Sequence, residues 1–284
     1  MPYYLVSRVW FITGASTGFG HLLAKEVLRR GERLIATARD ITKLEDLKGE
    51  YPNQVSTFTL DVTKPEQIES VVREALHVFG HIDVLVNNAG YGVAGALEEV
   101  SEAEFEPMIQ TNLYGLIRTT KAVLPNLRMR RSGHIFNISS IAGLVGSAGW
   151  GMYATTKFAV EGFSEALAAE LKPLGVHVTI VEPGPFRTDF LGRSGKLAAR
   201  ELPDYRQTAG KAREYFKTQS GKQPGDPQKA VEAIFAAADS PEPPLHLLLG
   251  KNALQRLRDK LAIRQKEIAD WESVTVGADF PEGE

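Results

Sequence analysis

The stretch that decides the fold is VWFITGASTGFG, residues 9–20. It starts with the apolar, strand-sized run Val9-Trp10-Phe11-Ile12 and continues through a glycine-rich turn into a helix predicted to begin near His21. Glycines let the backbone turn tightly and approach a pyrophosphate, and a helix N-terminus offers free N–H groups and a favourable dipole end. The stretch therefore predicts a phosphate-binding site, although such turns also serve ordinary strand-to-helix connections.

Strand-sized runs of β-branched and aromatic residues recur along the chain. Helix-sized segments separate them, with apolar residues three and four positions apart. This alternation predicts an α/β fold: a Rossmann-type doubly wound parallel sheet of about seven strands with helices on both faces. The strands are expected at residues 9–12, 33–37, 55–60, 82–86, 134–138, 176–181 and 245–249.

The composition favours a single domain, residues 1–284, and a small-molecule partner. With 284 residues and 43% hydrophobic composition, the chain can bury a substantial core. A formal net charge of -2 gives no reason to expect a nucleic-acid partner. The absence of cysteine excludes disulfides, thiolate catalysis and Cys-ligated metals, and the six histidines are scattered without a helical pair. We therefore expect no metal site.

The N-terminal sequence carries no sign of secretion or of a membrane anchor. Residues 1–10 contain one basic residue, Arg8, and only a short apolar stretch. No segment reaches the roughly 18 apolar residues of a membrane span. We expect a soluble, cytoplasmic protein without a membrane partner, ending in a frayed acidic tail.

Two later segments interrupt the alternation. Residues 190–226 are rich in charge and glycine and carry no strand signal. Because long insertions after a strand are usually functional loops, we predict a substrate lid here. In the C-terminal extension, residues 251–284, a charged amphipathic helix over 251–271 is expected to pack on its own domain or on a partner subunit. A membrane surface is the alternative.

Tyr153 and Lys157 are four residues apart in a segment with helical spacing, so they share one face and reach the same ligand. A free phenol has a pKa near 10, and a nearby ammonium favours the phenolate. We predict that Lys157 lowers the pKa of Tyr153 and so equips it for general acid–base catalysis. By itself, a Tyr-x-x-x-Lys pair also occurs by chance in solvated helices.

The glycine spacing, Gly-x-x-x-Gly-x-Gly, departs from the usual Gly-x-Gly-x-x-Gly fingerprint. It resembles the glycine motif of the short-chain dehydrogenase/reductase family. The resemblance covers nearly the whole chain, because five further motifs follow in the family's order. They are Asn87-Asn88-Ala89-Gly90, Asn112, Ser140, Tyr153-x-x-x-Lys157, and Pro183-Gly184 with Thr188.

The resemblance implies a catalytic tetrad of Asn112, Ser140, Tyr153 and Lys157. Ser140 would bind the substrate oxygen and Tyr153 would exchange a proton with it, so both would contact the substrate. Ser139 is chemically identical, and only the thirteen-residue interval to Tyr153 selects Ser140. Lys157 would also hold the nicotinamide ribose. Asn112 would lie at an irregularity of its helix and hold a water that links Lys157 to solvent.

The resemblance also implies a nicotinamide cofactor. Family members that use NAD carry an acid at the end of the second strand, where this chain has Ala38 and Arg39. A guanidinium pairs with a 2′-phosphate, so NADP(H) is expected. Alternatively Arg39 stacks on adenine or faces water, since Asp40 follows it. Asp61 would accept a hydrogen bond from the adenine, or residues 61–63 merely lead into a helix N-cap. The expected cofactor-binding residues are Gly14, Ser16, Thr17, Gly18, Phe19, Gly20, Arg39, Asp61, Val62, Asn88, Ala89, Gly90, Tyr153, Lys157, Pro183, Gly184, Phe186 and Thr188.

Residues 157–167, 181–184 and 186–188 are most similar to the retinol and hydroxysteroid dehydrogenase branch. This implies hydride transfer between NADP(H) and a small hydrophobic ketone, aldehyde or alcohol. Family members assemble through the helices that carry Asn112 and Tyr153, so a homodimer or homotetramer is expected. The candidate substrate-facing residues, besides the lid, are Tyr91, Leu144, Val145 and Trp150.

Three other classes share parts of this pattern. A catalytically silent NADP(H)-binding sensor or scaffold remains the alternative, although such proteins usually have a damaged tetrad and this one is complete. Sugar-nucleotide epimerases and dehydratases have their second glycine one position earlier and usually a longer chain. Enoyl-thioester reductases space their tyrosine and lysine more widely.

Overall fold

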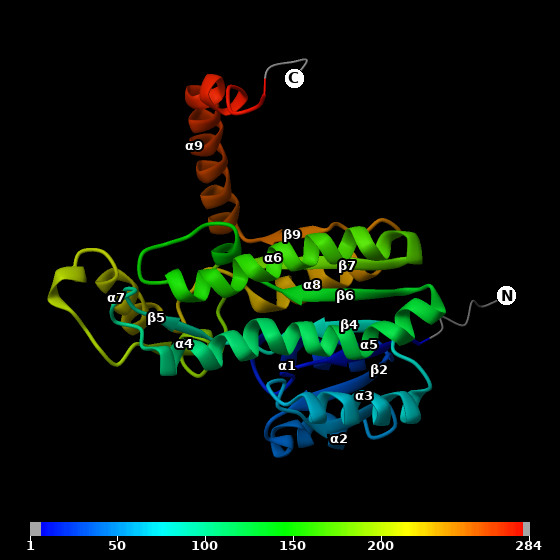
Figure 1. The fold of residues 1–284 in the computed structure, drawn as a ribbon. Coiled ribbons are helices and arrows are strands. Elements are labelled where there is room, and N and C mark those ends of the chain that lie inside the picture. Colours follow the sequence, from blue (N-terminus) through cyan, green and yellow to red (C-terminus); the bar gives the residue numbers. More distant parts are fainter. Residues whose placement is uncertain (1–6, 281–284) are drawn as a thin grey trace.

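The computed structural model describes residues 7–280 and confirms the α/β fold (Figure 1). Residues 1–6 of the N-terminal stretch and residues 281–284 of the expected tail lie outside it. Seven parallel strands pair in the order β3-β2-β1-β4-β6-β7-β9. Because the order reverses beside β1, the carboxyl ends of β1 and β4 diverge into a crevice where such sheets bind ligands. The strands are β1 (Val9–Ile12), β2 (Arg33–Ala38), β3 (Val55–Thr59), β4 (Val84–Asn87), β6 (Gly133–Ile138), β7 (Val176–Pro183) and β9 (His246–Leu249).

Successive residues of β1 are buried on opposite faces of this sheet. Trp10 and Ile12 belong to the core under α1 and α8, whereas Val9 and Phe11 belong to the core under α3, α5 and α6. All four side chains are fully buried. A continuous apolar run without alternation is therefore what a strand covered on both faces requires. The helices are α1 (Gly18–Arg29), α2 (Glu45–Glu50), α3 (Pro65–Phe79), α4 (Glu102–Ile109), α5 (Leu116–Arg130), α6 (Gly151–Leu171) and α8 (Pro227–Ala238).

The insertion after β7 is more ordered than its sequence indicates. Within residues 190–226 lie a short strand, β8 (Gly195–Leu197), and a helix, α7 (Gly210–Gln219). β8 pairs in parallel with β5 (Gly92–Ala94) in a separate two-stranded sheet. The expectation that this segment has no strand is wrong, because three residues are too few to show alternation. Only glycine fits at the first residue of β8, because a Cβ on Gly195 would lie 2.3 Å from Cζ of Phe216.

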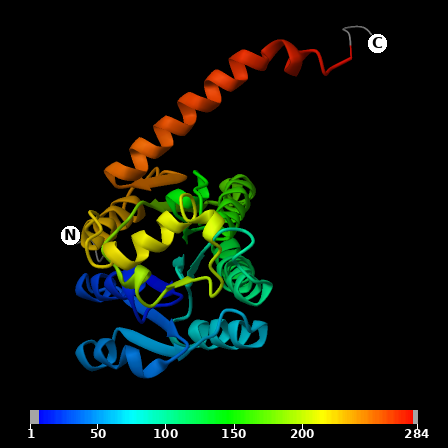
Figure 2. The ribbon, with the colours of Figure 1, turned by 90° about the vertical axis from the view of Figure 1, so that its left-hand side faces the viewer.

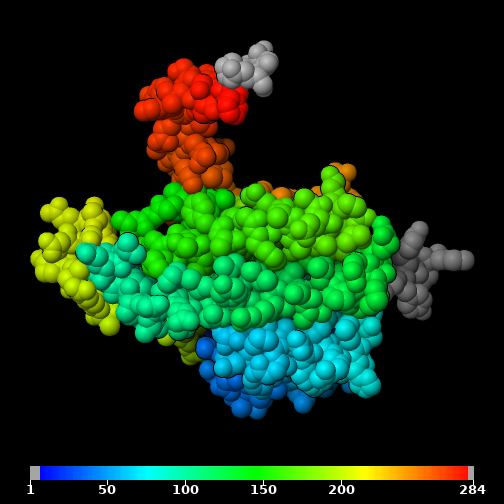
Figure 3. Space-filling view, viewed as in Figure 1, coloured from blue at the N-terminus to red at the C-terminus, as the bar shows by residue number. Residues whose placement is uncertain are grey.

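The C-terminal helix, α9 (Lys251–Val276), starts at the predicted residue and runs beyond Trp271, where we expected its end. Only its first turns contact the body, and the remainder projects as an arm (Figures 2 and 3). Of the two expected packing surfaces, the helix's own domain therefore accounts only for those first turns, and a partner subunit stays a prediction for the rest. Within residues 7–280, no helix has the length and apolar character needed to cross a bilayer.

Candidate active site

A cleft of about 900 Å³ opens at the carboxyl ends of the central strands. Its walls are the glycine-rich turn, the ends of the strands β2, β4, β6 and β7, and the insertion after β7. Ser140, Tyr153 and Lys157 line it, whereas Asn112 lies behind its wall. Of the expected cofactor-binding residues, only Gly20 does not line this cleft. The sequence motifs therefore meet in one place.

The glycine-rich turn has a conformation that favours glycine. Gly14 and Gly18 have φ angles of 68° and 57°, in the left-handed region. A Cβ on Gly20 would lie 2.4 Å from both Asn88 Nδ2 and the Gly14 carbonyl oxygen. Asn88 Nδ2 donates hydrogen bonds of 3.0 Å to the carbonyl oxygens of Thr13 and Gly14. The turn is thus fixed against β4, and α1 begins at Gly18, before the predicted His21.

Thr13 is an anchor of this turn that the sequence analysis missed. It is buried, and its Oγ1 accepts hydrogen bonds from the N–H groups of Asn88 (3.0 Å) and Ala89 (3.1 Å). The same hydroxyl donates to the Val86 carbonyl oxygen at 3.3 Å. Thr13 therefore joins the end of β1 to the end of β4. The sequence feature that could have identified this anchor is a threonine between an apolar strand and the first glycine of the turn.

Ser139 and Ser140 point in different directions. Ser140 caps the short helix η3 (Ile141–Gly143), and its Oγ accepts a hydrogen bond of 3.1 Å from the Ala142 N–H. Its hydroxyl also lies close enough to Tyr153 to lower the pKa of that tyrosine. Ser139 is buried and donates its hydroxyl to Glu161. Of the two adjacent serines, Ser140 is the one that pairs with the tyrosine.

Burial raises the pKa of Tyr153 to about 12, and the neighbouring Ser140 hydroxyl opposes this rise. The prediction that Lys157 lowers this pKa is wrong for the structure. Lys157 Nζ donates to the Ile138 carbonyl oxygen at 2.7 Å and lies 5.8 Å from the centre of the tyrosine ring. Tyr153 therefore keeps its proton at neutral pH.

Burial also lowers the pKa of Lys157, to about 8, while Glu161 acts in the opposite direction. Asn112 lies nearby, across Gly90: a Cβ on this glycine would be 3.1 Å from Asn112 Oδ1 and 3.8 Å from Lys157 Nζ. The expected helix irregularity at Asn112 is a π-helical segment, η2 (Gln110–Gly115). The Asn112 side chain bonds the backbone N–H and carbonyl of Tyr91, at 2.9 and 2.8 Å.

Arg39 lines the cleft beyond the end of β2. Among the described residues, its guanidinium has no hydrogen-bond or ion-pair partner. Asp40 instead accepts from the Thr42 N–H at 3.2 Å and pairs with Lys43 at 3.4 Å. Asp61 also lines the cleft, and its Oδ1 accepts from the N–H (2.9 Å) and hydroxyl (2.8 Å) of Thr63. This end of the cleft thus presents an unpaired cation.

Aromatic side chains form the wall beside Tyr153. Trp150, Tyr153 and Phe190 pack against one another, with ring centroids 5.6 to 6.3 Å apart. Gly92 makes room for them: a Cβ there would lie 3.0 Å from Cζ of Phe190 and 3.2 Å from Cδ2 of Tyr153. Phe190 comes from the insertion after β7, so this segment brings apolar surface to the tyrosine.

Two of the four candidate substrate-facing residues line the cleft. They are Tyr91 and Trp150. Leu144 and Val145 are not among its lining residues, so that part of the prediction is wrong. They follow η3, where the chain turns toward α9, and the Leu144 carbonyl oxygen accepts a hydrogen bond from Lys260.

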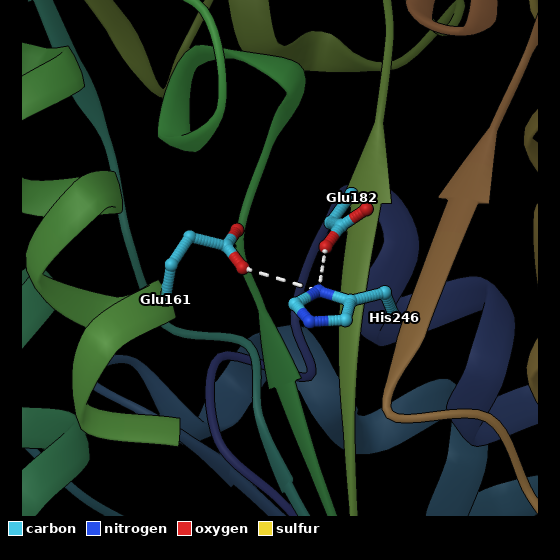
Figure 4. Close-up of side chains that lie close together, drawn as sticks. All are labelled: Glu161, Glu182 and His246. Carbon is cyan, nitrogen blue, oxygen red and sulfur yellow. Dashed lines mark hydrogen bonds and ion pairs between the residues drawn. The ribbon is translucent and has the colours of Figure 1, made fainter. Parts of the chain in front are cut away.

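A buried pair of carboxyl groups lies behind the cleft (Figure 4). His246 Nδ1 is 2.6 Å from Glu182 Oε1 and 3.8 Å from Glu161 Oε2. Burial raises the pKa of both glutamates, that of Glu161 to about 8. The three side chains lie close enough to hold a cation, and a proton shared by the carboxyls also balances their charge. No local sequence pattern indicates this cluster, because its members lie far apart in the chain.

Comparison with known proteins agrees with this geometry. The profile of a family described as short chain dehydrogenase matches residues 8–197. Human retinol dehydrogenase 8 is 38% identical over 256 residues, covering 84% of this chain and 80% of that protein. A short-chain dehydrogenase from Streptomyces avermitilis has a TM-score of 0.91 and 41% identity, covering 96% of this chain and 100% of that one. An alcohol dehydrogenase from the archaeon Thermococcus sibiricus, complexed with 5-hydroxy-NADP, has a TM-score of 0.71 and 30% identity, covering 86% and 96%.

Proposed function

The chain belongs to the short-chain dehydrogenase/reductase family, in its retinol dehydrogenase-like branch, and on that premise we propose that it is an NADP(H)-dependent oxidoreductase. It interconverts a hydrophobic ketone or aldehyde and the corresponding alcohol. The observation that carries the proposal is the buried, protonated Tyr153, which shares the cleft with Ser140 and lies one helical turn from Lys157.

The residues of the cleft fit a dinucleotide. The backbone of the glycine-rich turn is open to close approach, since Gly14 and Gly18 carry no side chain, and α1 points its N-terminus at the cleft. Arg39 supplies the cation for a 2′-phosphate, which supports NADP(H) over NAD(H). In this proposal Asp61 binds the adenine and Lys157 the nicotinamide ribose. Residues 183–188 bind the carboxamide.

The proposed chemistry needs one proton and one hydride. When bound, NADP(H) supplies the hydride to the carbonyl carbon, or accepts it from the alcohol. Ser140 donates a hydrogen bond to the substrate oxygen and fixes its position. Tyr153 donates its hydroxyl proton to that oxygen in reduction and accepts it in oxidation. Because the raised pKa of Tyr153 favours the phenol, the unliganded site is poised for reduction.

Lys157 and Asn112 complete the proposed machinery. The Lys157 ammonium is held by the Ile138 carbonyl oxygen, which fixes it beneath the tyrosine ring. Asn112 lies next to it across Gly90, where we propose that it holds a water between Lys157 and solvent. Both residues therefore serve to resupply the proton that Tyr153 gives up.

A hydrophobic substrate is supported by the wall of the cleft next to Tyr153. Trp150 and Phe190 stack on each other and both contact the tyrosine ring. Such a wall binds an apolar group beside the reacting carbon and excludes water from it. The similarity to retinol dehydrogenase 8 supports the same class of substrate.

The test follows the consumption of NADPH and, in parallel, of NADH over a panel of hydrophobic ketones, aldehydes, and steroid and retinoid carbonyls. We expect turnover with NADPH and a loss on the order of 10²- to 10⁴-fold in Tyr153→Phe, because general acid–base catalysis contributes about that much. In Arg39→Asp we expect NADPH to bind roughly ten- to a hundredfold more weakly while NADH binding is retained.

Each part of the proposal fails separately. A wild-type preference for NADH would overturn the assignment of Arg39 and leave the catalytic tyrosine in place. Full activity of Tyr153→Phe would overturn the mechanism. Tight NADPH binding without turnover of any substrate in the panel would favour a silent sensor or scaffold instead.

A further inference from the structure

The distal part of α9 has no partner in the structure. The helix has 26 residues, so it is about 39 Å long. Arg256 Nη2 donates to Ser147 Oγ at 2.6 Å, and Lys260 lies over the Phe158 ring, 4.8 Å from its centre. From residue 261 to residue 280 every residue is exposed. Most of the stability of a helix in a protein comes from packing of its apolar face, so an arm that packs on nothing is a candidate to bind a second surface.

An apolar seam runs along the arm. Leu261, Ile268 and Trp271 are 55%, 59% and 64% exposed. Together with the residues nearer the body they recur at alternating intervals of three and four, the spacing of a two-helix coiled coil. One polar residue, Arg264, interrupts the seam, and its aliphatic stem can still cover apolar surface. The seam positions in chain order are Leu254, Leu257, Leu261, Arg264, Ile268 and Trp271.

We infer that this seam binds α9 of a second copy of the chain, with the two helices antiparallel. Charges beside the seam decide the direction, because such residues set the orientation of paired helices. In a parallel pair, Glu267 of each copy would face Glu272 of the other, and both contacts would repel. In an antiparallel pair, Lys260 of each copy would leave the Leu144 carbonyl oxygen and face Glu267 of the other, and both contacts would attract. The two-fold axis passes between residues 262 and 263.

The charge of the distal arm argues against a membrane as the occupant. Residues 261–276 contain two basic residues, Arg264 and Lys266, and three acidic ones, Glu267, Asp270 and Glu272. Helices that lie on membranes instead carry an excess of lysine and arginine on their polar face. The distal arm therefore offers an anionic bilayer no excess of positive charge, whereas its acidic residues complement the basic residues near the base of a second copy.

Antiparallel pairing brings the tip of each arm to the base of the other. Trp271 of one copy would pack on Leu254 of the other. Arg256 lines the catalytic cleft, and so does Ser147, to which it is hydrogen-bonded. The tip of the second copy would thus lie near the part of α9 that also lines the cleft. This inference stands independently of the proposed catalytic function.

Distances between spin labels test the arrangement directly, since the chain has no native cysteine. Ile263→Cys places the label near the two-fold axis, and Val276→Cys places it near the tip. Antiparallel arms give a short distance between the two labels at position 263 and one of about 40 Å at position 276. Short distances at both positions would show parallel arms. The absence of a short distance at position 263 would show that the arms do not pair, and either result overturns the inference.

A matched pair of variants tests the seam. Ile268 lies in the seam and Ile263 outside it, and the two side chains are 59% and 61% exposed. We expect Ile268→Gln to weaken self-association on the order of tenfold or more, so that the mass measured by light scattering halves on dilution. Ile263→Gln should associate like wild type. Equal association of both variants, or sedimentation of the wild type with phosphatidylserine-containing vesicles that Ile268→Gln abolishes, would overturn the inference.

Discussion

Glu161 lies one helical turn beyond Lys157 on α6, and its buried carboxyl group faces that of Glu182 on β7 (Figure 4). Two further groups surround the Glu161 carboxyl group. The Ser139 hydroxyl donates to it, and the His246 ring lies beside it, with Glu165 at 3.8 Å from that ring on the solvent side. When Glu161 is ionised, it raises the pKa of Lys157. A buried acid outside the tetrad therefore affects the charge of the lysine.

The first prediction concerns the pH dependence of catalysis in Glu161→Gln. The pKa of Lys157, about 8, already includes a rise caused by Glu161. Glutamine removes that contribution, so Lys157 loses its proton at lower pH, and we expect the alkaline limb of kcat/KM to move toward lower pH. Steady-state rates with NADPH across the alkaline range measure this. Glu165→Gln, an exposed change one turn further along α6, is the control, and an unmoved limb in Glu161→Gln would contradict the coupling.

The second prediction concerns the stability of the same variant. The pKa of Glu161 is about 8 in the folded chain, above the ordinary value of 4.5 that holds for the unfolded chain. Between pH 4.5 and pH 8, folding therefore takes up a proton at Glu161. The free energy of unfolding of the wild type therefore loses this contribution as pH rises through that range. Glutamine does not titrate, so Tm of Glu161→Gln relative to wild type should increase from about pH 5 to about pH 8. Thermal unfolding of both proteins at about pH 5 and about pH 8 measures this difference in Tm. A difference in Tm that is the same at both pH values would refute the prediction.

The sequence predicted the frame of the site better than its electrostatics. Strand runs such as Val9-Trp10-Phe11-Ile12 are long and apolar enough to identify the sheet, and the topology then brings every motif to one edge. His246 and Glu182 are neighbours only because β9 pairs with β7, a relation that no local pattern records. Helical spacing placed Lys157 near Tyr153, but it could not show that burial dominates the pKa of the tyrosine.

The third prediction separates the two adjacent serines. Ser140 adjoins Tyr153 in the cleft, whereas Ser139 donates its hydroxyl to Glu161. Loss of a donor to the reacting oxygen costs about 10²- to 10³-fold in kcat, so Ser140→Ala should lose that much. Ser139→Ala should retain most of its kcat. Instead, the alkaline limb of its kcat/KM profile should shift, because the substitution alters the surroundings of Glu161. Equal losses of kcat in the two variants would contradict the assignment.

The fourth prediction tests the glycine-rich turn with two glycines that both lie in helices. A Cβ on Gly20 would lie 2.4 Å from Asn88 Nδ2 and from the Gly14 carbonyl oxygen, whereas a Cβ on Gly162 meets nothing within 4 Å. Gly20→Ala must therefore push Asn88 away from the turn and should cost roughly 1–3 kcal/mol of stability. Gly162→Ala should add about 0.5–1 kcal/mol, because alanine restricts the unfolded chain and suits a helix.

Binding should separate the same two variants, because the displaced Asn88 is the residue that fixes the Gly14 carbonyl against β4. A turn without this anchor loses the arrangement of N–H groups that favours a pyrophosphate, so Gly20→Ala should bind NADPH at least about tenfold more weakly. Gly162→Ala lies outside the cleft and should bind it like wild type. Titration of NADPH fluorescence together with chemical unfolding measures both quantities. Wild-type affinity in a folded Gly20→Ala would show that the close approach of Gly20 to Asn88 is not needed to hold the cofactor.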